Sequence, residues 1–316
     1  MSNRNKLIIL TVMAVVLILL FLFGSVGSNW GYILPRRATK ILAIALTGAV
    51  IAFSTIIFQT ITNNRILTPS IIGLDSLYLL IQTFIIFIFG SNSAMVLNKN
   101  FNFLLSVVLM ILFAGVLYKL LFKQSGKNIY LLLLVGLIFG TFFESLSTFM
   151  QVLIDPNEFM IVQNKMFASF NNVNTDLLTI SFVLVLLIAI YFARFSKYLD
   201  VMSLGKEQAI NLGVDYDYVV KRMLVIIAIL VSISTALVGP ITFLGLLVAN
   251  VAHEFLKTYR HRYLILGSVL ISIVALVGGQ LIVERVFTFS TTLSVIVNFV
   301  GGVYFIYLLL KESKAW

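Results

Sequence analysis

Residues 7–23 read LIILTVMAVVLILLFLF, a stretch without one charged side chain, and similar apolar stretches recur to the end of the chain. A helix needs about 20 apolar residues to cross the hydrocarbon core of a membrane. A membrane barrel would show short segments of alternating polarity instead. The sequence therefore predicts an all-α polytopic membrane protein with a single transmembrane domain over residues 1–316. We expect ten spans, at about 7–24, 38–61, 70–90, 101–122, 129–150, 177–195, 219–238, 241–256, 263–283 and 293–310.

The composition supports this interpretation. The 316 residues are 60% hydrophobic and 11% charged, with a mean hydropathy of +1.08. Soluble domains are about 45–50% apolar and about 25% charged, so an ordinary soluble enzyme and a disordered chain are both excluded. The chain has no cysteine and two histidines, so we expect no disulfide, no thiol nucleophile and no metal site built by this chain.

The first apolar run follows Arg4 and Lys6 and precedes the small residues Gly-Ser-Val-Gly-Ser at 24–28, a pattern that a signal peptide also shows. The run is longer than the apolar region of a typical signal peptide, and the rest of the chain is membrane-embedded as well. We therefore expect a retained first span.

The distribution of basic residues predicts the orientation. Lys and Arg total 22 against 12 Asp and Glu, and with ten spans sixteen of the 22 fall on the side that also holds both termini. Because basic residues collect in cytoplasmic loops, we expect both termini in the cytoplasm. The excess positive charge is thus explained by topology, and we expect no nucleic-acid partner.

The cytoplasmic loop from about Ser196 to Tyr218 contains a short helical segment at about 203–214. Residues 206–212 favour a helix, and Gly213 suits a left-handed C-terminal cap. Ala209 and Leu212, three apart, are expected to share a face. Such a helix in a cytoplasmic loop either docks a soluble partner or lies against its own bundle.

This segment, LGKEQAINLGV at 204–214, resembles the coupling-helix motif L-G-x-x-x-A-x-x-L-G-V of permease subunits in ABC importers for iron-siderophores, haem and vitamin B12. Four further segments resemble motifs of that family in the same order: Leu34-Pro35-Arg36; Gly48, Gln59, Asn64–Pro69 and Gly73; Val238–Leu247; and Gly301-Gly302. Ala249-Asn250 departs from the family's Pro-His, Ser290–Ser294 from its Glu-Leu-Pro-Val-Gly, and Asn64-Arg65-Ile66 from its Asn-Pro-Leu. With the segment 167–172, these departures resemble the subgroup that imports catecholate-type siderophores such as petrobactin.

The resemblance implies a type II importer of ferric siderophore in a bacterial cell membrane. It implies a second permease subunit, with a heterodimer favoured over a homodimer, two ATPase subunits, and an extracellular or periplasmic siderophore-binding protein, besides membrane lipid. The chain has no G-x-x-x-x-G-K-S/T phosphate loop, so ATP and Mg²⁺ are expected on the ATPase partner and no cofactor on this chain. The chain is therefore expected to be a transport subunit and not an enzyme.

The resemblance also implies site residues. ATPase coupling is expected at Leu204, Gly205, Lys206, Glu207, Ala209, Leu212 and Gly213. Docking of the binding protein is expected at Arg36, Arg37 and Arg285, whose planar guanidinium groups suit carboxylates; anchoring of helix ends to lipid headgroups is the alternative. Candidates for lining the pathway are Gln59, Asn63, Asn64 and Glu144.

Four polar residues in or beside apolar runs have competing interpretations. Charged groups within a membrane are functional candidates, but Glu144 also fits a protonated or hydroxyl-bonded structural residue. Asp75 is expected near the cytoplasmic start of the third span. His253 and His261, beside several basic residues, are interpreted as interface residues.

Two other function classes stay open. An ion- or proton-coupled secondary transporter acting without an ATPase would show inverted repeats with paired broken helices and buried acid–base pairs. We find no convincing repeat in the sequence. An intramembrane enzyme would need a catalytic constellation, and none is visible in the sequence.

Overall fold

The computed structural model describes residues 2–24, 29–123, 129–171, 173–289 and 291–313. Within these ranges the protein is all-helical, with fourteen α-helices and one 3₁₀ helix, and no strand. The small-residue segment at 25–28, which bears on the signal-peptide alternative, lies outside the described residues. The all-α prediction is confirmed.

Each of the ten predicted ranges corresponds to one helix, and the shortest of these, α12, has 13 residues. These are α1 (Asn3–Phe23), α2 (Trp30–Thr62), α3 (Leu74–Phe89), α5 (Lys99–Lys123), α6 (Ile129–Leu153), α8 (Thr175–Ala193), α11 (Tyr216–Val238), α12 (Leu244–Leu256), α13 (His261–Arg285) and α14 (Leu293–Ser313). Seven of them are long and apolar enough to cross a membrane, while α3, α12 and the described part of α14 are shorter apolar helices. The short elements between them are η1 (Pro69–Ile72), α4 (Ala94–Leu97), α7 (Pro156–Lys165), α9 (Ser196–Met202) and α10 (Lys206–Asn211).

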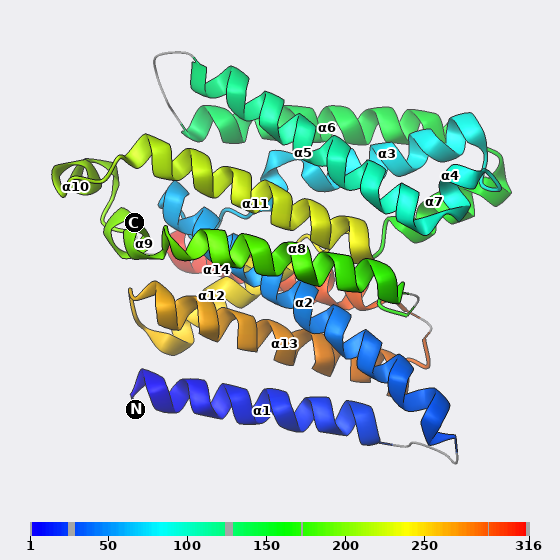
Figure 1. Cartoon of the computed structure of the whole chain (residues 1–316), viewed down its shortest axis with the longest axis horizontal. Helices are drawn as coiled ribbons and strands as arrows, with labels where there is room; N and C mark the ends of the chain where they lie inside the picture. Colours follow the sequence, from blue (N-terminus) through cyan, green and yellow to red (C-terminus); the bar gives the residue numbers. More distant parts are fainter. Residues whose placement is uncertain (1, 25–28, 124–128, 172, 290, 314–316) are drawn as a thin grey trace.

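The helices lie side by side along the long axis of the molecule (Figure 1). The start of α1 lies at the same end as α9 and α10, and α4 and α7 lie at the opposite end. We call these the α10 end and the α7 end. At the α7 end, the Asp155 side chain accepts a hydrogen bond from the Asn157 N–H and Pro156 takes the first helical position, so α7 begins with a regular N-cap.

Helix α2 is the central element, in contact with α11, α12 and α13. It begins at Trp30, eight residues before the predicted start at 38, so Pro35 lies inside the helix. Pro35 lies beyond the first turn, so it removes one intrahelical hydrogen bond without ending the helix, and the L-P-R segment is part of α2. At the α10 end of α2, every residue from Ser54 to Thr62 is buried.

A crossing of η1 with α6 brings two backbones into direct contact. A methyl group on Gly136 would lie 2.9 Å from both the Ile71 carbonyl oxygen and the Ile72 Cα, and one on Gly73 would lie 3.0 Å from Gly140. Gly73 also has a φ of 85°, which glycine adopts without strain. These glycines fix where α3 begins, near the middle of the long axis (Figure 1).

Candidate functional site

Helix α10 is bounded by glycines on both sides. Gly205 precedes it with a φ of 102°, and Gly213 follows it with a φ of 83°. The Val214 N–H donates to the Ala209 carbonyl over 3.0 Å, the long bond of a Schellman motif, which satisfies a carbonyl at the end of the helix. The helix and glycine cap predicted from the sequence are confirmed.

Three large apolar side chains are exposed on this segment. Leu204, Ile210 and Leu212 are exposed by 57%, 50% and 63%, while Ala209 is fully buried. The expectation that Ala209 and Leu212 share a packing face is therefore wrong. The helix ends at Asn211, so Leu212 lies beyond the regular turns for which a spacing of three defines a face. Lys206 and Glu207 are also exposed, next to these apolar side chains.

Helix α9, which leads into α10, is tied to two membrane helices by one histidine. His261 Nδ1 lies 2.6 Å from Asp200 Oδ1, and the His261 backbone N–H donates to the same oxygen over 2.8 Å. On the other side of the ring, His261 Nε2 lies 2.8 Å from Thr60 Oγ1. The three residues belong to α9, α13 and α2. The Thr60 hydroxyl donates to the Ile56 carbonyl over 2.8 Å, so its oxygen is free to accept a hydrogen bond from His261 Nε2.

The environment of Asp200 favours its charged form. Burial opposes this by raising the pKa, but the hydrogen bonds from the backbone and ring of His261, and the charge of Arg260, hold the pKa of Asp200 below its usual value. His261 is 5% exposed, so its interpretation as an interface residue is wrong. Sequence reasoning missed this three-residue contact, which we call the Asp200–His261–Thr60 relay. Only the position of His261 at the start of a span gave a signal.

A cavity of about 270 Å³ lies at the α10 end of α2. It brings together three predicted pathway residues, Gln59, Asn63 and Asn64, with His253 and His261. Asn63 ends α2 in the left-handed conformation that asparagine tolerates. The buried Gln59 side chain donates to the carbonyl of the loop residue Arg65.

The same loop carbonyl accepts a second bond, over 3.0 Å, from Asn250 Nδ2 of α12. Asn250 is one of the residues that departs from the family pattern, so this departure has a structural role. The side chain of Asn64 accepts the Ile66 N–H over 2.9 Å, which closes a turn in the loop.

At the α7 end, the three predicted docking arginines differ in environment. Arg36 is exposed, and its guanidinium lies 4.2 Å from the centre of the Tyr32 ring. Arg285 is exposed at the end of α13, with its guanidinium beside Gly24. Arg37 turns inward instead, and its Nη1 donates to the carbonyls of Phe21, Leu22 and Gly24 over 3.0, 3.1 and 2.7 Å. Arg37 therefore caps α1.

The same end holds an ion pair between α2 and α13. Lys40 Nζ lies 2.6 Å from Glu284 Oε1, and Gln280 donates to the same oxygen over 2.9 Å. This group fixes the arginine-bearing ends of α2 and α13 relative to each other.

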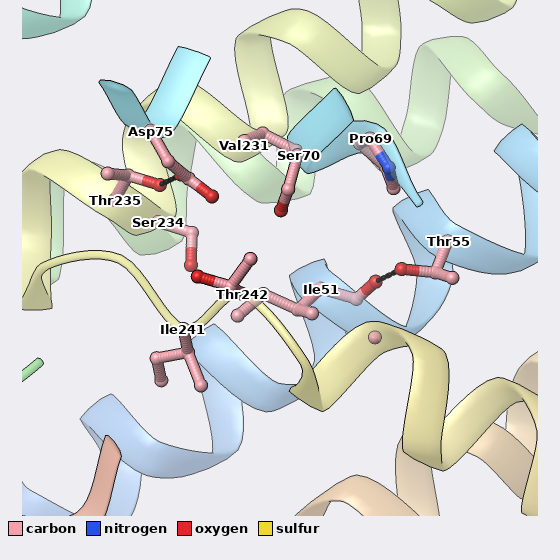
Figure 2. A pocket seen from close by; sticks show the side chains of 11 residues that line it. Ile51, Thr55, Pro69, Ser70, Asp75, Val231, Ser234, Thr235, Ile241 and Thr242 are labelled. Carbon is pink, nitrogen blue, oxygen red and sulfur yellow. Dashed lines mark hydrogen bonds between the residues drawn. The ribbon is translucent and has the colours of Figure 1, made fainter. Parts of the chain in front are cut away.

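The two acidic residues in apolar helices are placed differently. Glu144 is exposed on α6, among exposed phenylalanines such as Phe142 and Phe149. Asp75 lies in the first turn of α3, facing a polar cavity (Figure 2), and accepts a hydrogen bond from Thr235. Asp75 thus lies at the start of the third predicted span, as expected, and its placement on the cytoplasmic side stays a prediction.

Comparisons with known proteins agree with this architecture. The petrobactin import system permease protein YclO of Bacillus subtilis is 67% identical over 316 residues, which is all of both chains. The petrobactin import system permease protein FatC of Bacillus anthracis is 38% identical over 280 residues, 89% of this chain and 79% of that protein. A second petrobactin permease of Bacillus subtilis, YclN, is 23% identical over 287 residues, 88% of this chain and 85% of that protein.

A solved structure, an inward-facing conformation of a metal-chelate type ABC transporter, has a TM-score of 0.84 at 23% identity, covering 98% of this chain and 100% of that one. The fold is that of a type II ABC importer permease, as predicted. A model of the FecCD transport family matches residues 6–311. The match covers nearly the whole chain, so this multi-pass membrane protein belongs to the FecCD transport family.

Proposed function

We propose that this chain is a permease subunit of an ABC importer that carries a ferric siderophore of the catecholate type, petrobactin or a close analogue, across the bacterial cell membrane. The observation that carries the proposal is the 67% identity with a petrobactin import permease over the full length of both chains.

ATP hydrolysis, with its Mg²⁺, is assigned to a separate ATPase subunit that docks on the α10 segment. The support is the exposed apolar row of Leu204, Ile210 and Leu212, held in place by Gly205 and the Gly213 cap. Exposed apolar side chains on a short ordered helix are suited to insertion into a groove of a soluble partner. The Asp200–His261–Thr60 relay would then carry a displacement of α9 and α10 to α2 and α13.

A siderophore-binding protein is assigned to the α7 end, with Arg36 and Arg285 as its carboxylate-binding residues. Both side chains are exposed, and the Lys40–Glu284 pair sets the spacing of their helices. Arg37 supports this surface indirectly because it fixes the end of α1.

The α10 end is assigned to the cytoplasm, together with both termini. Basic residues predicted on that side support this, although two of them, Lys127 and Lys314, lie outside the described residues. The polar cavity at Gln59, Asn63 and Asn64 would then lie near the exit of the pathway.

The partner permease is expected to be a different chain. Two distinct petrobactin permeases from Bacillus subtilis, YclO and YclN, both match this chain but differ widely in identity to it, 67% and 23%. Glu144, exposed on α6, would face the pathway between the two permeases or the partner chain.

The test is uptake of petrobactin loaded with radioactive iron by cells that lack the gene, with and without the intact gene restored. We expect uptake only with the gene, and its loss when the phosphate-loop lysine of the partner ATPase is replaced. A hydroxamate siderophore serves as the substrate control. Uptake that persists with the inactive ATPase but stops when the proton gradient is dissipated would instead establish a secondary transporter.

Affinity purification of the tagged chain from native membranes tests the assembly. We expect the ATPase and a second, different permease to be recovered with it. Recovery of two differently tagged copies of this chain in one complex would show a homodimer and contradict the heterodimer.

A further inference from the structure

A small cavity with a carboxylate and several hydroxyl groups in its lining lies where α3 and α12 begin. Its volume is about 20 Å³, enough for one water-sized particle. It lies between η1, the starts of α3 and α12, and the facing sides of α2 and α11 (Figure 2). Helices that begin within the membrane, beside unwound backbone, are the places where transporters bind small ions.

One wall of this cavity carries a carboxylate. Thr235 Oγ1 donates to Asp75 Oδ1 over 3.0 Å, and Ser70 lines the same cavity. Asp75 lies in the first turn of α3, where the helix dipole favours a negative charge. The Thr235 hydroxyl and the helix N-terminus favour the ionised side chain, whereas burial without a compensating charge opposes it.

Helix α11, which also carries Thr235, presents an oxygen without a hydrogen-bond partner in the described part of the chain. Ser234 is 4% exposed, and in the described part of the chain its Oγ is buried and unpaired. Figure 2 shows this hydroxyl directed towards the cavity, near Thr242. Thr242 is exposed, so the cavity opens beside it. A buried unpaired hydroxyl is costly, and an occupant of the cavity would satisfy it.

The residues that line the cavity include no Lys, Arg or His. The carboxylate of Asp75 therefore has no cationic side chain to compensate it there, which is unfavourable at the depth of a membrane. The polar side chains of the lining present oxygen atoms only, the ligand type that hard cations prefer.

We propose that this cavity is a binding site for one alkali-metal cation, for which Na⁺ is the probe, held by Asp75 with Ser234, Ser70 and Thr235. The ion supplies the missing positive charge and a partner for Ser234. Because its ligands come from η1, α3 and α11, binding fixes these elements relative to one another. The site is independent of the siderophore and of the import function proposed above.

The test is the melting temperature of the purified full chain in NaCl, KCl and choline chloride at equal ionic strength. A ligand that binds only the folded state raises the melting temperature as its concentration increases. We expect a saturable rise of a few degrees in NaCl over choline chloride. The rise should disappear in Asp75→Asn and shrink in Ser234→Ala, and KCl should reveal the preference for ion size.

Ser232→Ala is the matched control, since it removes a buried hydroxyl from the same helix that already donates to the Ala228 carbonyl. It should retain the full Na⁺ effect. Three outcomes would overturn the proposal. Identical melting in all salts would mean that the cavity holds water. A pH-dependent but Na⁺-independent stability that Asp75→Asn removes would mean that Asp75 binds a proton instead. A Na⁺ effect unchanged in both cavity variants would place the ion elsewhere.

Discussion

The adjacent residues Arg36 and Arg37 have different environments although they are one position apart. Arg36 lies exposed over the Tyr32 ring, whereas Arg37 points back to three carbonyls at the end of α1. The family resemblance predicts docking for Arg36, and Arg37 is included as its neighbour beside the motif. Their difference comes from the helical rotation of about 100° between neighbours, which turns Arg37 towards α1.

Substitution should separate these two roles. Arg37→Ala removes charged hydrogen bonds, each of the kind that contributes about 1.5–3 kcal/mol, and should lower the melting temperature of the purified protein. Arg36→Ala should leave the melting temperature unchanged but reduce siderophore uptake, because the binding protein loses a partner. Equal melting temperatures for the two variants would contradict the capping role of Arg37.

The Asp200–His261–Thr60 relay gives a second prediction for single residues. Asp200→Asn, His261→Gln and the double variant form a cycle, read out as free energy of unfolding. Residues in contact show coupling energies of about 0.5–3 kcal/mol, so the two single effects should not add. Because the pKa of Asp200 is lowered in the folded state, its contribution is present above the pKa of the unfolded state and is lost as the pH falls through the folded value. Simple additivity at neutral pH would show that the contact does not stabilise the fold.

Among the elements, α10 carries the most specific prediction. Replacing residues 204–212 with a flexible Gly/Ser segment should abolish uptake while the protein still inserts in the membrane, since the segment lies outside the long apolar helices. Leu212→Asp should weaken recovery of the ATPase in affinity purification, whereas Asn211→Ala, an exposed polar neighbour, should not. Normal uptake by the Gly/Ser variant would show that residues 204–212 do not couple the ATPase to transport.

The crossing of η1 and α6 gives a prediction that concerns packing alone. Gly136→Ala places a methyl group 2.9 Å from backbone atoms of Ile71 and Ile72, and such overpacking costs about 1–3 kcal/mol. Gly115→Ala on α5 meets no atom within 4 Å and should be neutral or slightly stabilising. The melting temperatures of the two variants provide the comparison. A Gly136→Ala protein as stable as the wild type would mean that the crossing can separate at little cost.

The elements also show what could be predicted from the sequence. The ten long helices follow from continuous apolar runs, because membrane helices satisfy their own backbone and need only length and hydropathy. Helix α2 begins earlier than expected, since Pro35 near a helix start does not terminate it. The Asp200–His261–Thr60 relay could not be predicted from the sequence, because its three residues meet only through the packing of distant segments. The position of Asp75 likewise depends on a contact between distant segments, because Gly136 and Gly140 of α6 contact the backbone at Ile71–Gly73.

For the whole molecule, the orientation in the membrane can be tested directly because the chain has no cysteine. Single cysteines introduced at Arg36 and at Leu212 occupy exposed positions at opposite ends. In intact cells a membrane-impermeant maleimide should label the cysteine at position 36, and label the one at 212 only after permeabilisation. Labelling of position 212 in intact cells would place the α10 end outside.

Helix α2 joins the two ends of the molecule without interruption. From Arg36 to Thr60 it extends about 36 Å at 1.5 Å per residue, from the exposed arginine surface to the relay beneath α9. A stiff helix of this kind provides a route for coupling between the two proposed docking events, and thermodynamic linkage makes any such coupling reciprocal. If binding of the siderophore-binding protein at Arg36 raises the affinity of the ATPase for α10 by some factor, binding of the ATPase must raise the affinity for the siderophore-binding protein by the same factor.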